Sequence, residues 1–228
     1  MSAQAETVLS IENVAVHFGG LIAISDMTFV VRSGEILGLI GPNGAGKTTA
    51  FNVVTGFLKQ TSGNVRYRTT LLNGLKPHEV AQLGLVRTFQ RTSVFQERTV
   101  FQNVLTGLHC RGRSKLWDML LRTKREIASE RELNEAAWEI LRFVGLDQRA
   151  EEHAGTLPYG EQRLMGVALA LAGKPSMLLL DEPVSGMNPA ETARFVKLVR
   201  KIRDSGVTIL LVEHDMPMVM ELSTASSC

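Results

Sequence analysis

Eight consecutive residues of this chain have the types and the spacing of a loop that binds phosphate, Gly41-Pro42-Asn43-Gly44-Ala45-Gly46-Lys47-Thr48. In such a loop, glycines let backbone N–H groups approach phosphate oxygens, and the N-terminus of the next helix adds a partial positive charge. Lys47 would then reach the β- and γ-phosphates, Thr48 would bind Mg²⁺ through its hydroxyl, and Thr49 would support the α-phosphate. The pattern predicts nucleotide binding, but GTPases, kinases and many ATPases share it.

Two adjacent carboxylates, Asp181 and Glu182, follow the apolar run Met177–Leu180. Such a run predicts a buried strand, and parallel sheets bind their ligands at the C-terminal ends of the strands. Asp181 is suited to hold Mg²⁺ directly or through water, and Glu182 to polarise the attacking water as a general base. Asp-Glu-Pro is also ordinary surface-turn sequence, but the loop at 41–48 favours the catalytic interpretation.

Hydrophobic patterns predict the elements that must position these residues. Val8–Val16 and Met27–Val31 are predicted strands, and Ile36–Ile40 is predicted to be a strand buried on both faces. Lys47–Thr55 can form a helix that ends at Gly56. Together they have the strand, loop and helix order of a phosphate-binding unit.

The rest of the chain alternates between apolar runs and a long helical segment. Met177–Leu180 and Val207–Val212 are continuously apolar, which predicts central strands of a parallel sheet. Between about Thr99 and Leu171 the pattern becomes helical. A helix is predicted to stop at Gly145. The apolar residues at helical spacing before this stop are Leu133, Ala137, Ile140, Leu141 and Val144. The sequence thus predicts an α/β core that contains an inserted helical subdomain.

Composition limits the class of protein. A chain of 228 residues, 44% hydrophobic, is long enough for one large domain with a real core, and its net charge of +2 implies no nucleic-acid partner. Cys110 and Cys228 have neither disulfide-framework nor zinc-site spacing, which fits a reducing cytosol. Because no run approaches the length of a spanning helix, a role at a membrane would be that of a peripheral subunit.

A third motif, Leu157-Pro158-Tyr159-Gly160-Glu161-Gln162, precedes a helix whose apolar stripe is Leu164, Val167, Ala168 and Leu171. Here the chain resembles the ABC ATPase family, whose signature Leu-Ser-x-Gly-x-Gln occupies this place. The resemblance implies a P-loop α/β fold with a parallel sheet, an antiparallel β subdomain and an inserted helical subdomain. It also implies a dimer in which the signature helix of one subunit closes on the γ-phosphate held by the other.

Further positions match the family's motifs. Phe18, in a loop after the first strand, matches the aromatic that stacks on adenine, and Gln90 matches the glutamine that contacts Mg²⁺ and senses the membrane partner. His214 matches the histidine that contacts the γ-phosphate, and Ser185-Gly186-Met187-Asn188 matches the loop that communicates between the two ATP sites. The alternative for Phe18 is a core position. The alternative for His214 is a surface or core histidine at a strand end whose hydrogen bonds are satisfied within the protein.

The predicted site residues fall into three groups by role. The catalytic group is Lys47, Gln90, Glu182 and His214, and the Mg²⁺ ligands are Thr48, Gln90 and Asp181. The residues predicted to bind ATP are Phe18, Gly41, Pro42, Asn43, Gly44, Ala45, Gly46, Lys47, Thr48, Thr49, Tyr159, Gly160, Gln162 and Asn188.

Two positions depart from the family pattern. Pro158 stands where the signature serine is usual, so it offers neither a hydroxyl nor an N–H, and Tyr159 and Gly160 must supply the backbone donors. Asn188 replaces the commoner aspartate, which keeps an acceptor and removes a charge. We expect altered strength at these places and no loss of hydrolysis, although a slowly hydrolysing, nucleotide-gated binding module is an alternative.

Within the family, the chain most resembles the larger ATP-binding subunit of branched-chain amino acid importers, through Arg87-Thr88-Phe89-Gln90, Gly186-Met187-Asn188-Pro189 and Glu213-His214-Asp215-Met216. This resemblance implies transmembrane permease subunits, a second ATP-binding subunit in a homo- or heterodimer, an indirect substrate-binding partner, and a peripheral place on the cytoplasmic face of the inner membrane. Alternatives are the ATPase of a lipopolysaccharide or lipid exporter and a soluble ATPase of the DNA-repair or translation kind.

The resemblance also predicts one ABC ATPase domain made of segments. Residues 1–91 would form the nucleotide-binding core with the β subdomain, 92–172 the helical subdomain, 173–222 the rest of the core, and 223–228 an atypical, truncated tail. The charged stretch Arg111–Arg131 would rest on anionic lipid or on the permease, or form a solvated helix face, which we favour.

Overall fold

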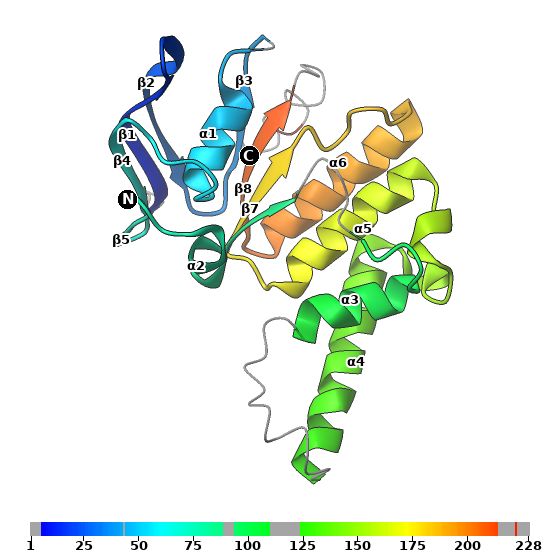
Figure 1. The fold of residues 1–228 in the computed structure, drawn as a ribbon. Coiled ribbons are helices and arrows are strands. Elements are labelled where there is room, and N and C mark those ends of the chain that lie inside the picture. Colours follow the sequence, from blue (N-terminus) through cyan, green and yellow to red (C-terminus); the bar gives the residue numbers. More distant parts are fainter. Residues whose placement is uncertain (1–5, 43, 89–93, 110–123, 214–221, 223–228) are drawn as a thin grey trace, which may run out of the picture. The chain divides into compact units, whose positions relative to one another are not determined.

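The computed structural model describes residues 6–42, 44–88, 94–109, 124–213 and 222, with backbone alone for 124–129. The chain divides into two compact units, Met1–Gln90 with Pro175–Cys228 and Arg91–Lys174. The first unit holds both sheets, and the second holds the helices that the chain forms between two strands of the parallel sheet (Figure 1). This is the predicted α/β class, with a parallel sheet, an antiparallel sheet and a helical region.

An antiparallel sheet is built from the N-terminal strands, in the order β2-β1-β4-β5. Strands β1 (Thr7–Phe18) and β2 (Leu21–Arg32) are longer than predicted and form a hairpin in which Phe18 pairs with Leu21. The Gly19-Gly20 turn between them is two residues long, a length that keeps both strands paired to their ends. Phe18 therefore ends a strand, and its predicted place in a loop was wrong. The sheet is completed by β4 (Ser62–Tyr67) and β5 (Thr70–Leu71).

A parallel sheet carries the predicted site, in the order β3-β8-β7-β6. Its strands are β3 (Ile36–Ile40), β6 (Leu85–Thr88), β7 (Met177–Asp181) and β8 (Thr208–Glu213). The central positions predicted for the last two are confirmed. Leu179 packs in the core with Phe51, whereas Leu178 points to the opposite face and is also fully buried. Burial on both faces explains the continuous apolar run.

Strand β3 was predicted to be buried on both faces, and this is wrong. Ile36 is buried, the next three residues are partly exposed, and Ile40 is 48% exposed. The physical reason is position, because β3 is the first strand in the order of the described sheet and pairs there with β8 alone. Its apolar sequence does not reveal that end position.

Three helices with described bounds belong to the first unit. Helix α1 (Lys47–Val54) follows the phosphate loop, and Gly56 just beyond it has φ 75°, the left-handed conformation expected where glycine ends a helix. Helix α2 (Pro77–Gln82) begins with a proline in its first turn, and α6 (Pro189–Asp204) does the same. Helix α6 buries one apolar stripe, which includes Phe195, Val199 and Ile202.

The second unit consists of α3 (Val100–His109), α4 (Lys124–Val144) and α5 (Tyr159–Ala172), with 3-10 turns at Asp147–Arg149 and Ala154–Thr156. The three helices pack on one another. Of the predicted stripe in α4, Ala137, Leu141 and Val144 are buried, whereas Leu133 and Ile140 are half-buried. Gly145 stops the helix with φ 75°.

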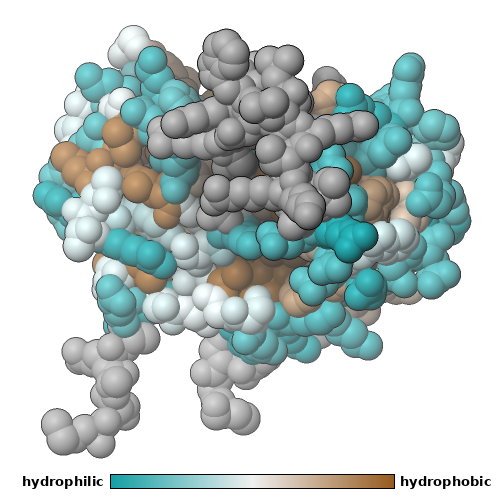
Figure 2. Space-filling model, turned by 90° about the horizontal axis from the view of Figure 1, so that it is seen from below, coloured by the Kyte–Doolittle hydropathy of each residue, from teal (hydrophilic) through white to brown (hydrophobic). Residues whose placement is uncertain are grey.

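Apolar side chains also reach the surface. On the face that Figure 2 draws, they gather in separate patches among hydrophilic residues. Within the described ranges, no helix has the length and apolar character needed to cross a membrane.

Candidate active site

The phosphate loop joins β3 to α1 and depends on two glycines with left-handed backbones. Gly44 has φ 83° and Gly46 has φ 79°, values that residues with a Cβ atom rarely adopt. A Cβ at Gly46 would also lie 2.7 Å from the carbonyl oxygen of Ala23, so the loop packs directly on β2 there. Gly46 is the N-cap of α1, and the free N–H groups of that helix therefore open onto the loop.

The side chain of Lys47 folds back into this loop. Its Nζ donates to the carbonyl oxygens of Gly41 at 2.7 Å and Pro42 at 2.8 Å. These bonds hold the ammonium group among the loop residues, beside the N-terminus of α1. Two sources of positive potential, the lysine and the helix end, thus act on the same place, as an anion site requires.

A cleft of about 260 Å³ opens beside the loop. It brings together residues that the sequence predicted for one site, Gly44, Gly46, Lys47, Thr48, Thr49 and Glu182. Its remaining lining, Leu21 to Ala23 at the start of β2, was missed, although the Gly19-Gly20 hairpin turn was a signal for it. Leu21 and Ile22 are 67% and 60% exposed, so the cleft has an apolar wall next to its cationic floor.

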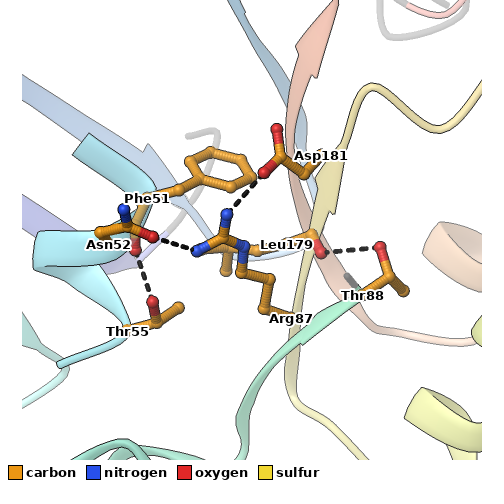
Figure 3. Close-up of polar contacts among 7 residues, drawn as sticks. All are labelled: Phe51, Asn52, Thr55, Arg87, Thr88, Leu179 and Asp181. Carbon is orange, nitrogen blue, oxygen red and sulfur yellow. Dashed lines mark hydrogen bonds and ion pairs between the residues drawn. The ribbon is translucent and has the colours of Figure 1, made fainter. Parts of the chain in front are cut away.

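Asp181 lies at the C-terminal end of β7, and its carboxylate is 2% exposed (Figure 3). Its Oδ2 accepts a hydrogen bond of 2.5 Å from Nη2 of Arg87. Its Oδ1 is buried and has no hydrogen-bond partner among the described residues. A buried carboxylate oxygen normally has a partner, so Oδ1 is suited to a metal-bound water or a cation.

Arg87, on β6, is the contact that sequence reasoning missed. Its Nη1 donates to Oδ1 of Asn52 on α1 at 2.7 Å, and its guanidinium carbon lies 5.5 Å from the centre of the Phe51 ring (Figure 3). The arginine therefore joins β6, α1 and the end of β7. The sequence held no signal for this contact beyond the strand pattern of residues 85–88.

Glu182 follows Asp181 with a strained backbone. Its φ is 44°, in the left-handed region that disfavours residues with a side chain, and its N–H donates to the carbonyl oxygen of Val212 at 2.9 Å. The next turn is held by Glu213, a second buried carboxylate that was missed, whose Oε1 accepts from the N–H of Val184 at 3.1 Å. Strain that the surroundings maintain at one residue of a cleft is typical of functional positions.

The predicted metal ligands fit Mg²⁺ in their chemistry. Mg²⁺ takes hard oxygen ligands and is usually held by one or two carboxylates together with substrate phosphates and water. Asp181 offers one oxygen without a hydrogen-bond partner among the described residues, and the exposed Thr48, which carries a hydroxyl, lines the cleft. Within the described residues, no cluster of three histidine, cysteine or acidic side chains forms an alternative metal site.

Two predicted residues of the first unit, Phe18 and Asn188, lie at the ends of described elements. Phe18 is 50% exposed at the end of β1, which excludes a core position. Asn188 is the N-cap of α6, where its Oδ1 accepts from the N–H of Glu191 at 3.0 Å and its own N–H donates to the Glu191 carboxylate at 2.9 Å. The acceptor of Asn188 is therefore used within its own helix.

In the second unit, Pro158 is the N-cap of α5, and Tyr159 and Gly160 form the start of the helix. The Tyr159 hydroxyl, on a side chain 48% exposed, accepts from Nη2 of Arg163 at 2.6 Å. The amide of Gln162 donates to the carbonyl oxygen of Leu157 at 2.9 Å, so this predicted ligand supports the turn before the helix. First-turn N–H groups of a helix have no partner within it.

Arg149 lies beside this helix start. It donates to Glu152 at 2.8 Å and pairs with Glu161 at 3.2 Å. The hydrogen bond to Glu152, followed by the charges of Glu161 and Glu152, raises the pKa of the Arg149 guanidinium. The carboxylate in the first turn of α5 is thus paired with a permanent cation.

Three predicted residues, Asn43, Gln90 and His214, lie outside the described residues, as does most of the charged stretch Arg111–Arg131. Their roles stay predictions.

Comparison with known proteins places these features in a family. The family model for "ABC transporter" matches residues 24–185. The high-affinity branched-chain amino acid transport ATP-binding protein LivG of Escherichia coli K12 is 41% identical over 96% of this chain and 86% of that protein. BraF of Pseudomonas aeruginosa PAO1, of the same description, is 40% identical over 95% of this chain and 85% of that protein.

A solved structure agrees with the fold. The ADP conformation of MJ1267, an ATP-binding cassette of an ABC transporter, superimposes with a TM-score of 0.82 at 32% identity, covering 95% of this chain and 84% of that one.

Proposed function

This chain belongs to the ABC transporter family, and on that premise we propose that it is the ATP-binding, ATP-hydrolysing subunit of an importer of branched-chain amino acids. The observation that carries the ATPase role is that Lys47, Thr48 and Glu182 line one cleft. The substrate rests on the relatives, because this kind of subunit does not itself touch the transported solute.

In the proposed reaction, the phosphate loop and the N-terminus of α1 bind the phosphates of ATP, and Lys47 neutralises their growing negative charge. Phe18 and the apolar wall at Leu21 hold the adenine. Glu182 accepts a proton from the attacking water and so increases its nucleophilicity toward the γ-phosphorus. The γ-phosphate leaves as inorganic phosphate, and ADP keeps the bridging oxygen.

Thr48, Asp181 and Gln90 would hold Mg²⁺, which neutralises the charge on the β- and γ-phosphates when it is bound. The first turn of α5, at Tyr159 and Gly160, would act on the nucleotide of a second ATP-binding subunit, and His214 on the γ-phosphate of its own. We place the assembled protein against transmembrane permease subunits, on the cytoplasmic side of the membrane.

Two substitutions test the ATPase proposal. Glu182→Gln removes the proton acceptor and should lower turnover by about 100-fold or more, with little change in ATP affinity. Lys47→Ala removes a charge-assisted contact with phosphate and should weaken ATP binding by about 10-fold or more. Lys197→Ala, at an exposed position on α6, is the control and should change neither quantity. Normal turnover in both test variants would show that the mechanism is wrong.

Uptake of labelled leucine, isoleucine and valine tests the substrate. Deletion of the gene in its own host should reduce uptake, the wild-type gene should restore it, and the Glu182→Gln gene should not. Unchanged uptake in the deletion strain, with an active ATPase, would contradict amino acid import and favour the exporter alternative.

A further inference from the structure

Arg87 is a buried arginine that contacts residues of two other elements, α1 and β7. Its side chain is 9% exposed, and its two terminal nitrogens bind Asn52 on α1 and Asp181 on β7 (Figure 3). Its guanidinium also lies over the ring of Phe51. Arginine can do this because the guanidinium is a planar fork with donors in fixed directions, which lysine lacks.

The hydrogen bond from Arg87 fixes the orientation of the Asp181 carboxylate, and the bond to Asn52 holds Arg87 in place. A carboxylate at a strand end can rotate about its side-chain torsions, and either oxygen can then face the metal site. Because Arg87 occupies Oδ2, Oδ1 is the oxygen left without a partner among the described residues. The ion pair thus determines which oxygen of Asp181 is available.

The second anchor connects this carboxylate to the phosphate loop. Asn52 lies four residues after Thr48 on α1, so the two share one face of that helix. The chain from Asp181 through Arg87 to Asn52 therefore joins the two elements that carry the predicted metal ligands Asp181 and Thr48. A change in the position of Arg87 would therefore shift the Asp181 carboxylate relative to α1.

We propose that Arg87 is a positioning residue for the metal–nucleotide site, which holds Asp181 so that its Oδ1 would be available to the Mg²⁺ of Mg-ATP, directly or through a bound water. This inference rests on the proposed function, since it concerns the same site. In this proposal Arg87 acts through Asp181, to which it donates a hydrogen bond. A merely structural ion pair would instead affect folding alone.

The test compares nucleotide affinity with and without metal. The affinity of the whole chain for a fluorescent ATP analogue is measured in excess Mg²⁺ and in EDTA, and the ratio of the two affinities reports on the metal. Loss of a group that orients a metal ligand typically weakens metal binding by about 10-fold or more, so Arg87→Met should lower the ratio by that factor. Affinity in EDTA should stay unchanged, because Lys47 and the loop amides are intact.

Two further variants separate charge from position. Arg87→Lys keeps the positive charge but cannot span Asn52 and Asp181, so it should recover only part of the ratio; full recovery would overturn the positioning role. Asn52→Ala keeps the ion pair and removes the other anchor, and should lower the ratio by about threefold. This second variant decides the question if Arg87→Met does not fold.

Arg203→Met is the matched control, because the ion pair of Arg203 among the described residues is with its sequence neighbour Asp204, at 2.7 Å. The ratio of nucleotide affinities in Mg²⁺ and in EDTA should be the same for Arg203→Met as for the wild type. An unchanged ratio in Arg87→Met, or an equal loss of affinity in EDTA and in Mg²⁺, overturns the role of Arg87 and leaves the proposed function intact. A wild-type chain that binds the nucleotide equally well in both conditions overturns the metal site itself, and the role of Arg87 with it.

Discussion

At the scale of single residues, the neighbouring carboxylates Asp181 and Glu182 lie in different surroundings, because β7 ends between them. Asp181 is buried, paired with an arginine and part of regular β7, whereas Glu182 lines the cleft and has a left-handed backbone. Different environments allow adjacent acids to perform different tasks. Asp181 is suited to act as a charged metal ligand, and Glu182 to accept a proton as a base. The strain at Glu182 has a consequence for stability that can be measured.

Glu182→Gly should abolish hydrolysis and still leave the chain at least as stable. Glycine adopts φ 44° without the steric cost that any side chain meets. We expect the free energy of unfolding to rise by about 0.5 to 1 kcal/mol, since part of the left-handed penalty is recovered. Urea denaturation measures this, with Glu182→Gln as the control that keeps the strain. Clear destabilisation by glycine alone would show that Glu182 has a structural role.

The two left-handed glycines of the phosphate loop should differ in their response to alanine. Gly44→Ala introduces mainly backbone strain, because a Cβ there meets no atom within 4 Å among the described residues beyond its chain neighbours. Gly46→Ala adds a Cβ 2.7 Å from the carbonyl oxygen of Ala23. We expect losses of about 1 kcal/mol for Gly44→Ala and about 2 to 3 kcal/mol for Gly46→Ala, measured by denaturant unfolding without nucleotide. Equal losses would mean that the contact with β2 relaxes freely.

At the scale of elements, the sequence predicted the strands, helices and helix ends that depend on a local pattern of residues. The apolar runs of β7 and β8, the helix after the phosphate loop and the stop at Gly145 follow from periodicity and glycine conformation, and all are present. What failed depends on neighbours in space. The exposure of β3 follows from its place in the sheet, and the contact of Arg87 with Asp181 joins residues 94 positions apart. A single sequence contains no periodic signal for either.

Helix α6 carries an element-scale prediction, because Asn188 and Glu191 form a reciprocal cap at its start. Asn188→Ala removes the side-chain acceptor, and we expect a loss of about 1 kcal/mol in the free energy of unfolding. Asn188→Asp keeps an acceptor and should preserve stability. Chemical denaturation of both variants measures the contribution of the cap to stability. An Asn188→Ala chain as stable as the wild type would show that the hydrogen bond accepted by Asn188 contributes no net stability.

At the scale of the whole molecule, the proposed ATP-binding groups belong to two compact units. Lys47, Thr48 and Glu182 are in the first, and Tyr159 and Gly160, at the start of α5, are in the second. If the start of α5 acts on the nucleotide of another subunit, its donors determine how well the assembled site stabilises the transition state. Pro158 is then the position where the family pattern and this chain differ most in chemistry.

Substitutions at Pro158 should measure how much that difference limits hydrolysis. Pro158→Ala restores an N–H, and Pro158→Ser restores an N–H and a hydroxyl. The N–H groups of Tyr159 and Gly160 and the helix dipole remain in the wild type, so we expect serine to raise turnover by at most about 10-fold, or 1.4 kcal/mol. Turnover at saturating Mg-ATP is compared for the three chains. A rise of about 100-fold for serine, with alanine unchanged, would show that the missing hydroxyl limits hydrolysis and would favour a slow, nucleotide-gated binding module.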